Sequence, residues 1–349
     1  MNRFDVVVVG GGPAGSAAAI GCAQRGWQVA LIERHAFPRF RPGESLHPGI
    51  EPLLQQLGVA ERLCGMDAMR FHGHWVQWNA PPQYIGFGGD DNGPWRGFQI
   101  ARARLDMALL QRAAALGVTV RQPCRARRVL IHQHRVIGVD TDTGPLFASY
   151  VLDASGASGW LGRRLQLPLR RCSPPLQVRF GYLDGHIAPY SQTPHLLADT
   201  DGWTWLAQVE EQTLHWARQT FEAQRLTRGD HPPCALPEPL RNLPPRGRPR
   251  SADVTWRISA APAGSGYFIA GDAASQLDPA SSHGVLKALM TGMQAAQAIS
   301  DCLRHPALQT AAQSQYSQWL SDWFERDKAQ LQRFYRLHPC PPRWLPTEE

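Results

Sequence analysis

Cysteines are few in this sequence and follow no pattern. The 349-residue chain holds seven of them, an odd number, spread singly from Cys22 to Cys340 without a CxxC pair. Metal sites and the disulfide frameworks of secreted domains need closely or regularly spaced cysteines. We therefore expect reduced thiols, no metal site and a cytoplasmic protein.

Long apolar runs are missing as well. The apolar stretch at the N-terminus, Val6 to Val9, has the length of a strand, whereas a membrane span needs roughly 18 residues. No secretory signal precedes it. Hydrophobic residues nonetheless make up 43% of the chain, so we expect a globular protein with no membrane span.

Charge is not concentrated along the chain. The formal net charge is +7, and the arginines are scattered apart from two short groups at residues 125–128 and 246–250. Nucleic-acid-binding proteins usually present a denser basic stripe. The balance excludes nucleic acid as the expected partner and suits an anionic ligand.

The N-terminus has a clear strand, turn and helix pattern. A β-branched run at residues 5–9 leads into Gly10-Gly11-Gly12-Pro13-Ala14-Gly15, and an Ala-rich segment follows at residues 16–24. A second strand at residues 28–32 ends at Glu33. This spacing predicts a βαβ unit of the Rossmann type.

The three motif glycines and the acidic residue each have a physical role. Gly10 permits the tight turn, Gly12 lets the backbone approach a pyrophosphate, and Gly15 lets helix and strand pack closely. Glu33 stands where a carboxylate accepts hydrogen bonds from ribose hydroxyls. The helix N-terminus faces the phosphate charge, so we predict a bound dinucleotide.

The rest of the chain divides into further units. Residues 175–255 alternate aromatic and polar positions between Pro and Gly breaks, which predicts an inserted antiparallel sheet. We expect an α/β fold with a discontinuous dinucleotide-binding domain, a sheet domain for the substrate and a helical tail. The expected bounds are 1–165 with 255–305 for the first, with 50–100 partly on the substrate side, then 166–254 and 306–349.

Three downstream segments identify the dinucleotide. Residues 267–273 (YFIAGDA), 102–106 (RARLD) and 153–156 (DASG) occur in the order and spacing found in the p-hydroxybenzoate hydroxylase superfamily. The chain resembles that superfamily over about residues 1–300. The resemblance implies FAD as the cofactor, with Asp272 on its ribityl chain.

Two more segments narrow the resemblance. Residues 41–46 (RPGESL) resemble the GES loop of flavin-dependent halogenases and their monooxygenase relatives, and residues 277–284 (LDPASSHG) resemble their DPxxSxG turn over the flavin ring. The flavin contacts implied by all these segments are Gly10, Gly12, Pro13, Ala14, Gly15, Glu33, Arg34, Arg41, Glu44, Ser45, Arg102, Ala126, Asp153, Gly156, Gly271, Asp272, Pro279, Ser282, Gly284 and Val285.

The match to tryptophan halogenases is incomplete. Their catalytic lysine lies shortly after the GES loop, but residues 69–74 (MRFHGH) contain no lysine. The glutamate of their DPxxSxG turn is replaced by Ser281, and their WxWxIP motif survives only as Trp203 and Trp205. These tryptophans share one face of a strand, where they line the active site or fill the core.

The chain resembles more closely the monooxygenases that mature tryptophylquinone cofactors. The phrases GESLHPGIEPLL, DVTWR and DPASSHGVLKALMTG carry that resemblance. It implies hydroxylation of an electron-rich aromatic, a tryptophan side chain of a partner quinoprotein precursor, through a flavin C4a-hydroperoxide. A halogenase of an indole or other aromatic, a geranylgeranyl reductase-like oxidoreductase and a non-catalytic flavin protein are the alternatives.

Histidines are the candidate catalytic residues. His283 belongs to the flavin turn, where an imidazole with a pKa near 6.5 transfers protons readily, although it also suits a helix cap. His47 follows the GES loop, and His72 and His74 lie near the missing lysine. No second dinucleotide fingerprint occurs between residues 150 and 260, so the reductant is either NAD(P)H that docks transiently or a separate flavin reductase.

Overall fold

The first layer of the fold is a largely parallel sheet that carries the glycine turn. The computed structural model describes residues 3–64, 68–78, 81–91, 93–188, 190–222 and 236–346. Eight strands form this sheet, in the order β10-β2-β1-β13-β12-β11, with β22 beside β13 and β21 beside β22. Their bounds are β1 Arg3–Val9, β2 Val29–Ile32, β10 Thr119–Arg121, β11 Ala126–His132, β12 Arg135–Thr141, β13 Gly144–Asp153, β21 Ala263–Gly264 and β22 Tyr267–Ile269.

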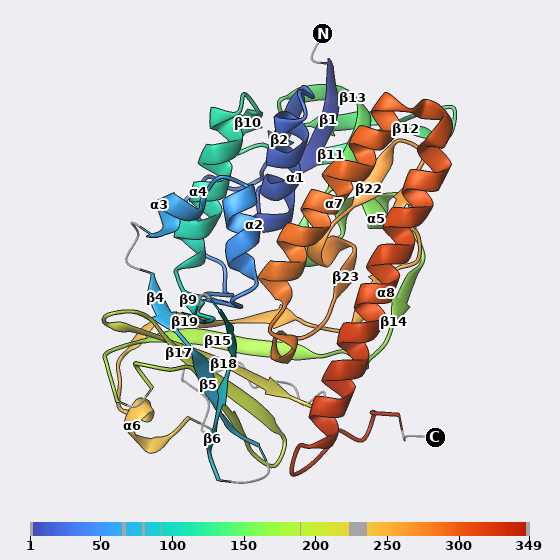
Figure 1. Cartoon of the computed structure of the whole chain (residues 1–349). Helices are drawn as coiled ribbons and strands as arrows, with labels where there is room; N and C mark the ends of the chain where they lie inside the picture. The colour runs from blue at the N-terminus through green and yellow to red at the C-terminus, as the bar shows by residue number, and fades with distance from the viewer. Residues whose placement is uncertain are drawn as a thin grey trace.

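Helices cover both faces of this sheet (Figure 1). On one face lie α1 Pro13–Gln24, α2 Ile50–Gln56, α3 Ala60–Cys64, α4 Arg102–Ala115 and α7 Gly284–Arg304, and their apolar side chains form the largest core. Small residues let α1 and α7 approach closely: a Cβ on Gly292 would lie 2.2 Å from the Ala14 carbonyl oxygen. The N-terminal and C-terminal parts of the first layer are therefore held together at this helix crossing.

The second layer is a seven-stranded sheet, ordered β19-β15-β18-β17-β16-β5-β6. The strands are β5 Gly73–Gln77, β6 Gln83–Gly86, β15 Gln177–Asp184, β16 His195–Ala198, β17 Gly202–Glu210, β18 Thr213–Thr220 and β19 Pro245–Asp253. All neighbours are antiparallel except β5 and β16. That parallel pair adds residues 73–86 to the sheet, and the division into domains predicted above stays a prediction.

Short elements join the two sheets. The small strands are β3 Ser45–Leu46, β4 Met69–Phe71, β9 Gly97–Gln99, β7 Gly89–Asp90, β8 Gly93–Pro94, β14 Leu169–Arg171, β20 Arg257–Ser259 and β23 Ser275–Gln276. The short helices are α5 Trp160–Arg164, α6 Glu238–Arg241, η1 Gly156–Ser158, η2 Gly271–Ala273, η3 Pro279–Ser281 and η4 Pro306–Leu308.

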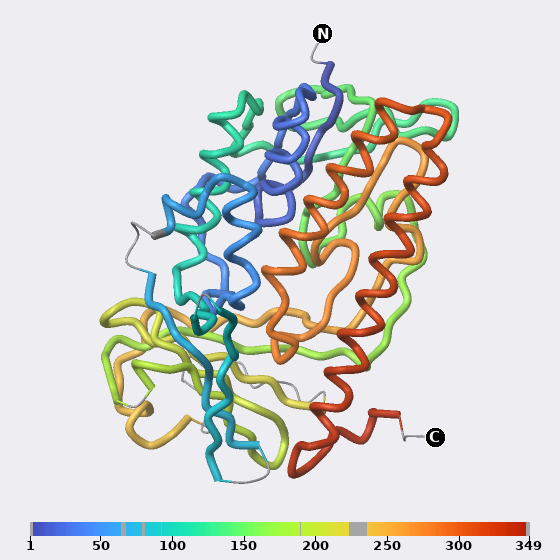
Figure 2. The backbone as a smooth tube through the Cα atoms, viewed as in Figure 1, coloured from blue at the N-terminus to red at the C-terminus, as the bar shows by residue number. Residues whose placement is uncertain are grey.

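The long helix α8, Gln309–Arg336, runs along both layers. Figure 2 shows its red trace passing from the first layer down to the seven-stranded sheet. Its Leu320 and Phe324 join a core of the first sheet, and Leu331 and Tyr335 join the core of the second. Within the described residues, no helix is both long enough and apolar enough to cross a membrane.

Candidate active site

The glycine turn has the shape that a dinucleotide needs. Gly10 has a φ of +108°, and a Cβ there would lie 2.4 Å from the Ala154 carbonyl oxygen. A Cβ on Gly15 would lie 1.9 Å from the Gly10 carbonyl oxygen. Gly12 caps α1 in an extended conformation, and Pro13 follows as its first residue. Because a side chain fits at neither Gly10 nor Gly15, this cradle suits the close approach of a pyrophosphate.

Glu33 reaches the turn from the end of β2. Its Oε2 accepts a hydrogen bond from the Gly11 amide at 2.9 Å, and its Oε1 accepts one from the His35 amide at 3.0 Å. Arg39 lies over the same turn, 3.9 Å from Glu33 and 3.4 Å from Asp106. The predicted Arg34 is exposed instead. Sequence reasoning missed Arg39, since no motif spacing marks it.

The second flavin fingerprint meets the first at the start of α1. Gly271 has a φ of +61°, its amide donates to Thr291 Oγ1 at 2.9 Å, and a Cβ on it would lie 2.9 Å from the Ala14 Cβ. The next residue, Asp272, is exposed. The two fingerprints, more than 250 residues apart in the sequence, therefore form one site, at which Asp272 lies 3.5 Å from Lys287.

Two other residues predicted as flavin contacts, Asp153 and Ala126, have different surroundings. Both oxygens of the buried Asp153 accept backbone hydrogen bonds, from the Ser155 amide at 2.9 Å and the Leu161 amide at 2.8 Å. This carboxylate fixes the loop that contains Gly156. Ala126 lies at the start of β11, and its side chain packs against the core on the far face of the sheet.

Arg102 ties α4 to the GES loop. Its Nε donates to Asp106 at 3.0 Å, and its Nη1 donates to the Pro42 carbonyl oxygen at 2.9 Å. A Cβ on Gly43 would lie 3.0 Å from Arg102 and 3.7 Å from Val285. The GES loop is thereby held between α4 and the first turn of α7.

Glu44 points to the second sheet. It is 3% exposed and accepts hydrogen bonds from the Gly43 amide and from the hydroxyl of Tyr182, and its Oε2 lies 3.8 Å from His215 Nδ1. Burial and the charge of Glu44 raise the pKa of Tyr182. The next side chain, Ser45, donates to Gln99 at 2.9 Å and accepts from Trp205 Nε1 at 3.3 Å. The loop thus couples the flavin side to both sheets.

A cluster of aromatic and imidazole rings lies beside this loop. We call it the ring cluster; its members are His47, His74, Phe87, Trp205 and His283. The His47 ring lies 5.5 Å from that of His283 and 5.9 Å from that of Phe87, and the His74 ring lies 5.9 Å from Phe87 and 6.1 Å from Trp205. The cluster therefore runs from the flavin turn to strand β17.

The structure separates the three histidines predicted as catalytic. His283 and His47 meet in the ring cluster, whereas His72 is exposed at a bend between β4 and β5. His74, two residues later, belongs to the ring cluster instead. Trp203 and Trp205 share a face but differ in role, since Trp203 is 1% exposed in the core and donates to Tyr335 at 2.9 Å.

The electrostatics of the histidines differ. Burial, followed by the charge of His283, lowers the pKa of His47, and burial and then His47 lower the pKa of His74. His283 has a different environment, because its Nδ1 lies 3.2 Å from Asp327 Oδ2 of α8. A carboxylate at this distance accepts a hydrogen bond from the imidazole, so Asp327 orients the His283 ring.

The turn before α7 is held by a buried carboxylate. Asp278 is fully buried and accepts hydrogen bonds from Trp256 Nε1 at 2.8 Å, the Tyr335 hydroxyl at 2.7 Å and Gln219 Nε2 at 3.2 Å. Burial raises its pKa. This network fixes the segment of Pro279, Ser282 and Gly284, in which Ser282 takes a left-handed φ of +57°.

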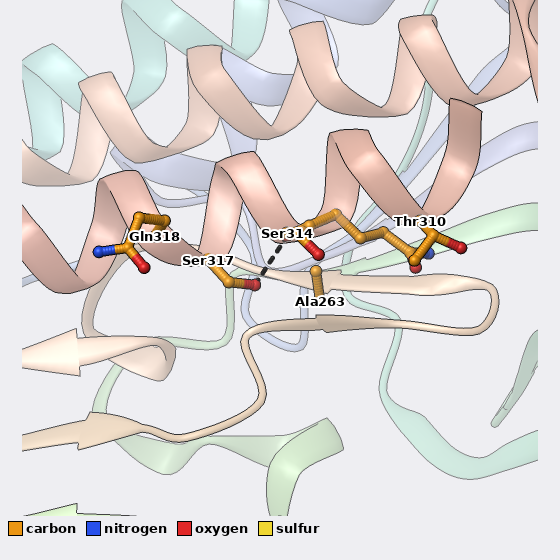
Figure 3. A pocket seen from close by; sticks show the side chains of 6 residues that line it. Ala263, Thr310, Ser314, Ser317 and Gln318 are labelled. Carbon is orange, nitrogen blue, oxygen red and sulfur yellow. Dashed lines mark hydrogen bonds between the residues drawn. The ribbon is translucent and has the colours of Figure 1, made fainter.

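A cavity beside the GES loop and a groove beside α8 occur among the described residues. One of about 350 Å³ lies where the GES loop faces β15 and β19, and its walls carry five arginines and three aromatic rings. These residues are Arg41, Arg102, Arg246, Arg248, Arg250, Phe40, Phe180 and Tyr182. The other, a polar groove between α8 and the β21–β22 hairpin, is lined by Ala263 and by uncharged residues such as Ser317 (Figure 3). No residue of the ring cluster lines this groove.

Lysine is almost absent from the chain, which has only Lys287 and Lys328. Lys287 is buried, donates to the Ser275 carbonyl oxygen at 2.6 Å and lies 3.5 Å from Asp272. Lys328 pairs with Glu325 on α8. Neither amine belongs to the ring cluster. In the part of the chain that the structure describes, no group of His, Cys, Asp and Glu side chains could hold a metal ion.

Comparison with known proteins gives a family and a set of relatives. Residues 3–225 match the family model described as "FAD binding domain". The flavin-dependent halogenase armH3 of Armillaria mellea is 28% identical, over 86% of this chain and 68% of its own. A 1H-pyrrole-2-carbonyl-[peptidyl-carrier protein] brominase of Pseudoalteromonas luteoviolacea is 27% identical, over 97% of this chain and 87% of its own.

Solved structures have the same fold. The flavin-dependent halogenase CmlS superposes with a TM-score of 0.86 at 24% identity, over 100% of this chain and 68% of the other. The peptidyl tryptophan dihydroxylase QhpG, described as essential for tryptophylquinone cofactor biogenesis, superposes with a TM-score of 0.75 at 23% identity, over 97% and 76%. At these identities the superpositions show the fold, and both halogenating and hydroxylating proteins share it.

Proposed function

We propose, from the premise that the chain belongs to the FAD binding domain family, that this FAD-dependent enzyme hydroxylates an electron-rich aromatic ring. When bound, the flavin supplies the redox chemistry. The protein contributes the cradle built on Gly10 and Gly15, and the ring cluster next to the flavin turn. An aromatic substrate suits this cluster because offset and edge-on ring contacts each stabilise by about 0.5–1.5 kcal/mol.

The observation that favours hydroxylation over halogenation is the absence of a free amine beside the ring cluster. The resemblance to tryptophan halogenases implies a lysine that captures hypohalite. Here Lys287 is buried between a carbonyl oxygen and Asp272, and Lys328 pairs with Glu325. A protonated amine held by a carboxylate has no lone pair to offer an electrophile. Oxygen transfer needs no such amine, and imidazoles take the inward positions of the cluster instead.

Halogenation is the second candidate function. The names of the relatives favour it over hydroxylation, since armH3 and the carrier-protein brominase are both halogenating enzymes. Under this alternative a histidine of the ring cluster takes over the part of the missing lysine. A halide-dependent product separates the two functions directly.

We further propose that the aromatic ring belongs to a tryptophan of a partner protein. The structural likeness to a peptidyl tryptophan dihydroxylase supports this substrate, while the carrier-protein brominase supports a ring attached to a carrier. Phe87 of the ring cluster is only half-buried, and the adjacent strand β6 is exposed throughout. A substrate carried on a protein can therefore approach from this edge.

The arginine-lined cavity is a suitable dock for the reductant. Arg102 and Arg246 already have carboxylate partners, Asp106 and Asp184. In the described part of the chain, Arg248 and Arg250 have no carboxylate partner, and Arg250 stacks on Phe40 at 4.5 Å. Free guanidinium groups beside aromatic rings suit a phosphorylated ligand with a planar ring. NAD(P)H has this chemistry, and a separate flavin reductase is the alternative.

A product assay tests the function. The FAD-loaded protein is reduced, exposed to ¹⁸O-labelled oxygen, and incubated with tryptophan, indole and tryptophan-containing peptides, with chloride and bromide or with neither. We expect a product that gains one or two labelled oxygen atoms regardless of halide, as detected by mass spectrometry. A chlorinated or brominated product without an oxygenated one assigns the second function. Reduced flavin that returns to the oxidised state with every substrate unchanged contradicts both.

A further inference from the structure

Helix α8 has one charged residue on its buried face. The buried positions along the helix are Ala312, Tyr316, Leu320, Phe324, Asp327, Leu331 and Tyr335. Their spacing of three or four residues is that of an apolar stripe, and Asp327 occupies one place in it. A carboxylate buried in such a stripe costs free energy unless it has a partner, so its presence at a core position calls for a partner.

That partner is His283. Asp327 Oδ2 lies 3.2 Å from His283 Nδ1, and the two side chains are 10% and 24% exposed. The residues are 44 positions apart in the sequence, on α8 and at the N-terminus of α7. A carboxylate accepts only, so His283 Nδ1 carries the hydrogen. Its Nε2, on the opposite side of the ring, is then the nitrogen that is free to accept a proton.

His47 completes the arrangement on the other side. Its ring meets that of His283 edge-on at 5.5 Å, and its Nδ1 accepts a hydrogen bond from the Gly49 amide at 3.0 Å. The neutral His47 therefore carries its hydrogen on Nε2. Burial and the charge of His283 both lower the pKa of His47. Among the described residues, His283 thus contacts one carboxylate, that of Asp327, and one imidazole, that of His47.

We propose that Asp327 is a positioning residue that makes His283 the proton acceptor of the reaction. The proposal rests on the proposed function only in requiring an aromatic substrate. When oxygen or halogen adds to a ring carbon, the hydrogen on that carbon must leave. The C–H bond breaks, its electron pair restores the aromatic ring, and the proton passes to His283 Nε2. The imidazolium is stabilised by Asp327 until the proton leaves to solvent.

Asp327→Asn tests the dyad without changing its shape. The amide still fits the buried position but no longer stabilises the imidazolium. In the FAD-loaded protein with ¹⁵N-labelled histidine, and with the His283 signal assigned through His283→Gln, we expect the pKa of His283 to fall by about one unit or more. Asp322→Asn is the matched control, because Asp322 lies on the same helix and pairs only with Gln318; it leaves the pKa unchanged. An unchanged pKa in Asp327→Asn refutes the dyad, whatever product the enzyme makes.

The kinetic test separates positioning from simple support of the fold. We expect kcat to fall roughly 100-fold in both Asp327→Asn and His283→Gln, with little change in KM. The double variant should lose no more than His283→Gln alone, because the two residues act as a unit. Additive losses, or a pH profile that does not shift to lower pH in Asp327→Asn, overturn the proposal. If the parent enzyme yields no aromatic product, the proposed function fails while the pKa measurement still decides the dyad.

Discussion

At the scale of single residues, Gly15 is the position that tolerates change least. A Cβ there would lie 1.9 Å from the Gly10 carbonyl oxygen, which is backbone and cannot rotate away. Gly15→Ala must therefore open the turn that receives the pyrophosphate. We expect a loss of about 1–3 kcal/mol, which corresponds to roughly 5- to 150-fold weaker FAD binding.

The flavin content of the purified protein and a fluorescence titration of the FAD-free protein measure this effect. Gly162→Ala is the matched control, because a Cβ on Gly162 in α5 has no neighbour within 4 Å. If both variants bind FAD as the parent does, the turn is not the site of the cofactor.

The residues of the site were predictable to different degrees. Gly10, Gly15 and Glu33 follow from local spacing, because a strand, a turn and a helix fix their relative positions within about thirty residues. Arg39 and Asp327 do not, because each acts only through a contact across the tertiary structure, with Asp106 and His283 respectively. No periodicity or motif in one sequence encodes such a pairing.

At the scale of elements, α8 is the helix that fastens the flavin turn to the second sheet. The Tyr335 hydroxyl donates to Asp278 at 2.7 Å and lies 2.9 Å from Trp203 Nε1 and 3.3 Å from Gln219 Nε2. Tyr335→Phe removes the one group common to all three contacts. It leaves the buried Asp278 with fewer donors, and we expect the free energy of unfolding to fall by about 1–3 kcal/mol.

Urea unfolding followed by tryptophan fluorescence measures this loss. Tyr84→Phe on the exposed strand β6 serves as the control, and it should shift the free energy of unfolding by no more than about 0.5 kcal/mol. Equal stability of the two variants would show that Tyr335 packs α8 without fastening it.

The helices and strands themselves were easier to predict than the pairing of the strands with one another. The βαβ unit of β1, α1 and β2 was confirmed, since it depends on the pattern within one short segment. The parallel pairing of β5 with β16 joins strands more than 100 residues apart. Such a pairing is decided by the packing of the whole domain, and the sequence pattern of either strand alone does not contain it.

At the scale of the whole molecule, the arginine-lined cavity between the GES loop and β19 makes a prediction about the source of the reducing electrons. If NAD(P)H docks there, Arg250→Glu places a repelling charge in the cavity, so KM for NAD(P)H should rise roughly tenfold or more. Oxidation of flavin already reduced by dithionite should keep its rate. Stopped-flow absorbance measures both, with Arg62→Glu on the exposed face of α3 as the control. Equal effects of the two variants favour a separate flavin reductase.

The buried histidines predict how the stability of the whole molecule responds to acid. Burial lowers the pKa of His47, His74, His195 and His215 from 6.5. In the window below 6.5 the unfolded chain therefore binds more protons than the folded chain, and stability falls as the pH falls. Asp153 and Asp278 act in the opposite direction, because burial raises their pKa values from 3.8. A variant that lacks one buried histidine but keeps Asp153 and Asp278 therefore isolates the contribution of that histidine to the pH dependence of stability.

His215→Gln is that variant. His215 lies on β18 and faces Glu44 of the GES loop; its side chain is 7% exposed, and its Nε2 has no hydrogen-bond partner among the described residues. Urea unfolding between about pH 7.5 and about pH 5.5 gives the slope of stability against pH for both proteins. We expect the slope to be smaller in the variant, because one fewer proton is taken up on unfolding. Parallel curves would mean that His215 is protonated in the folded protein, held in that state by Glu44 3.8 Å away.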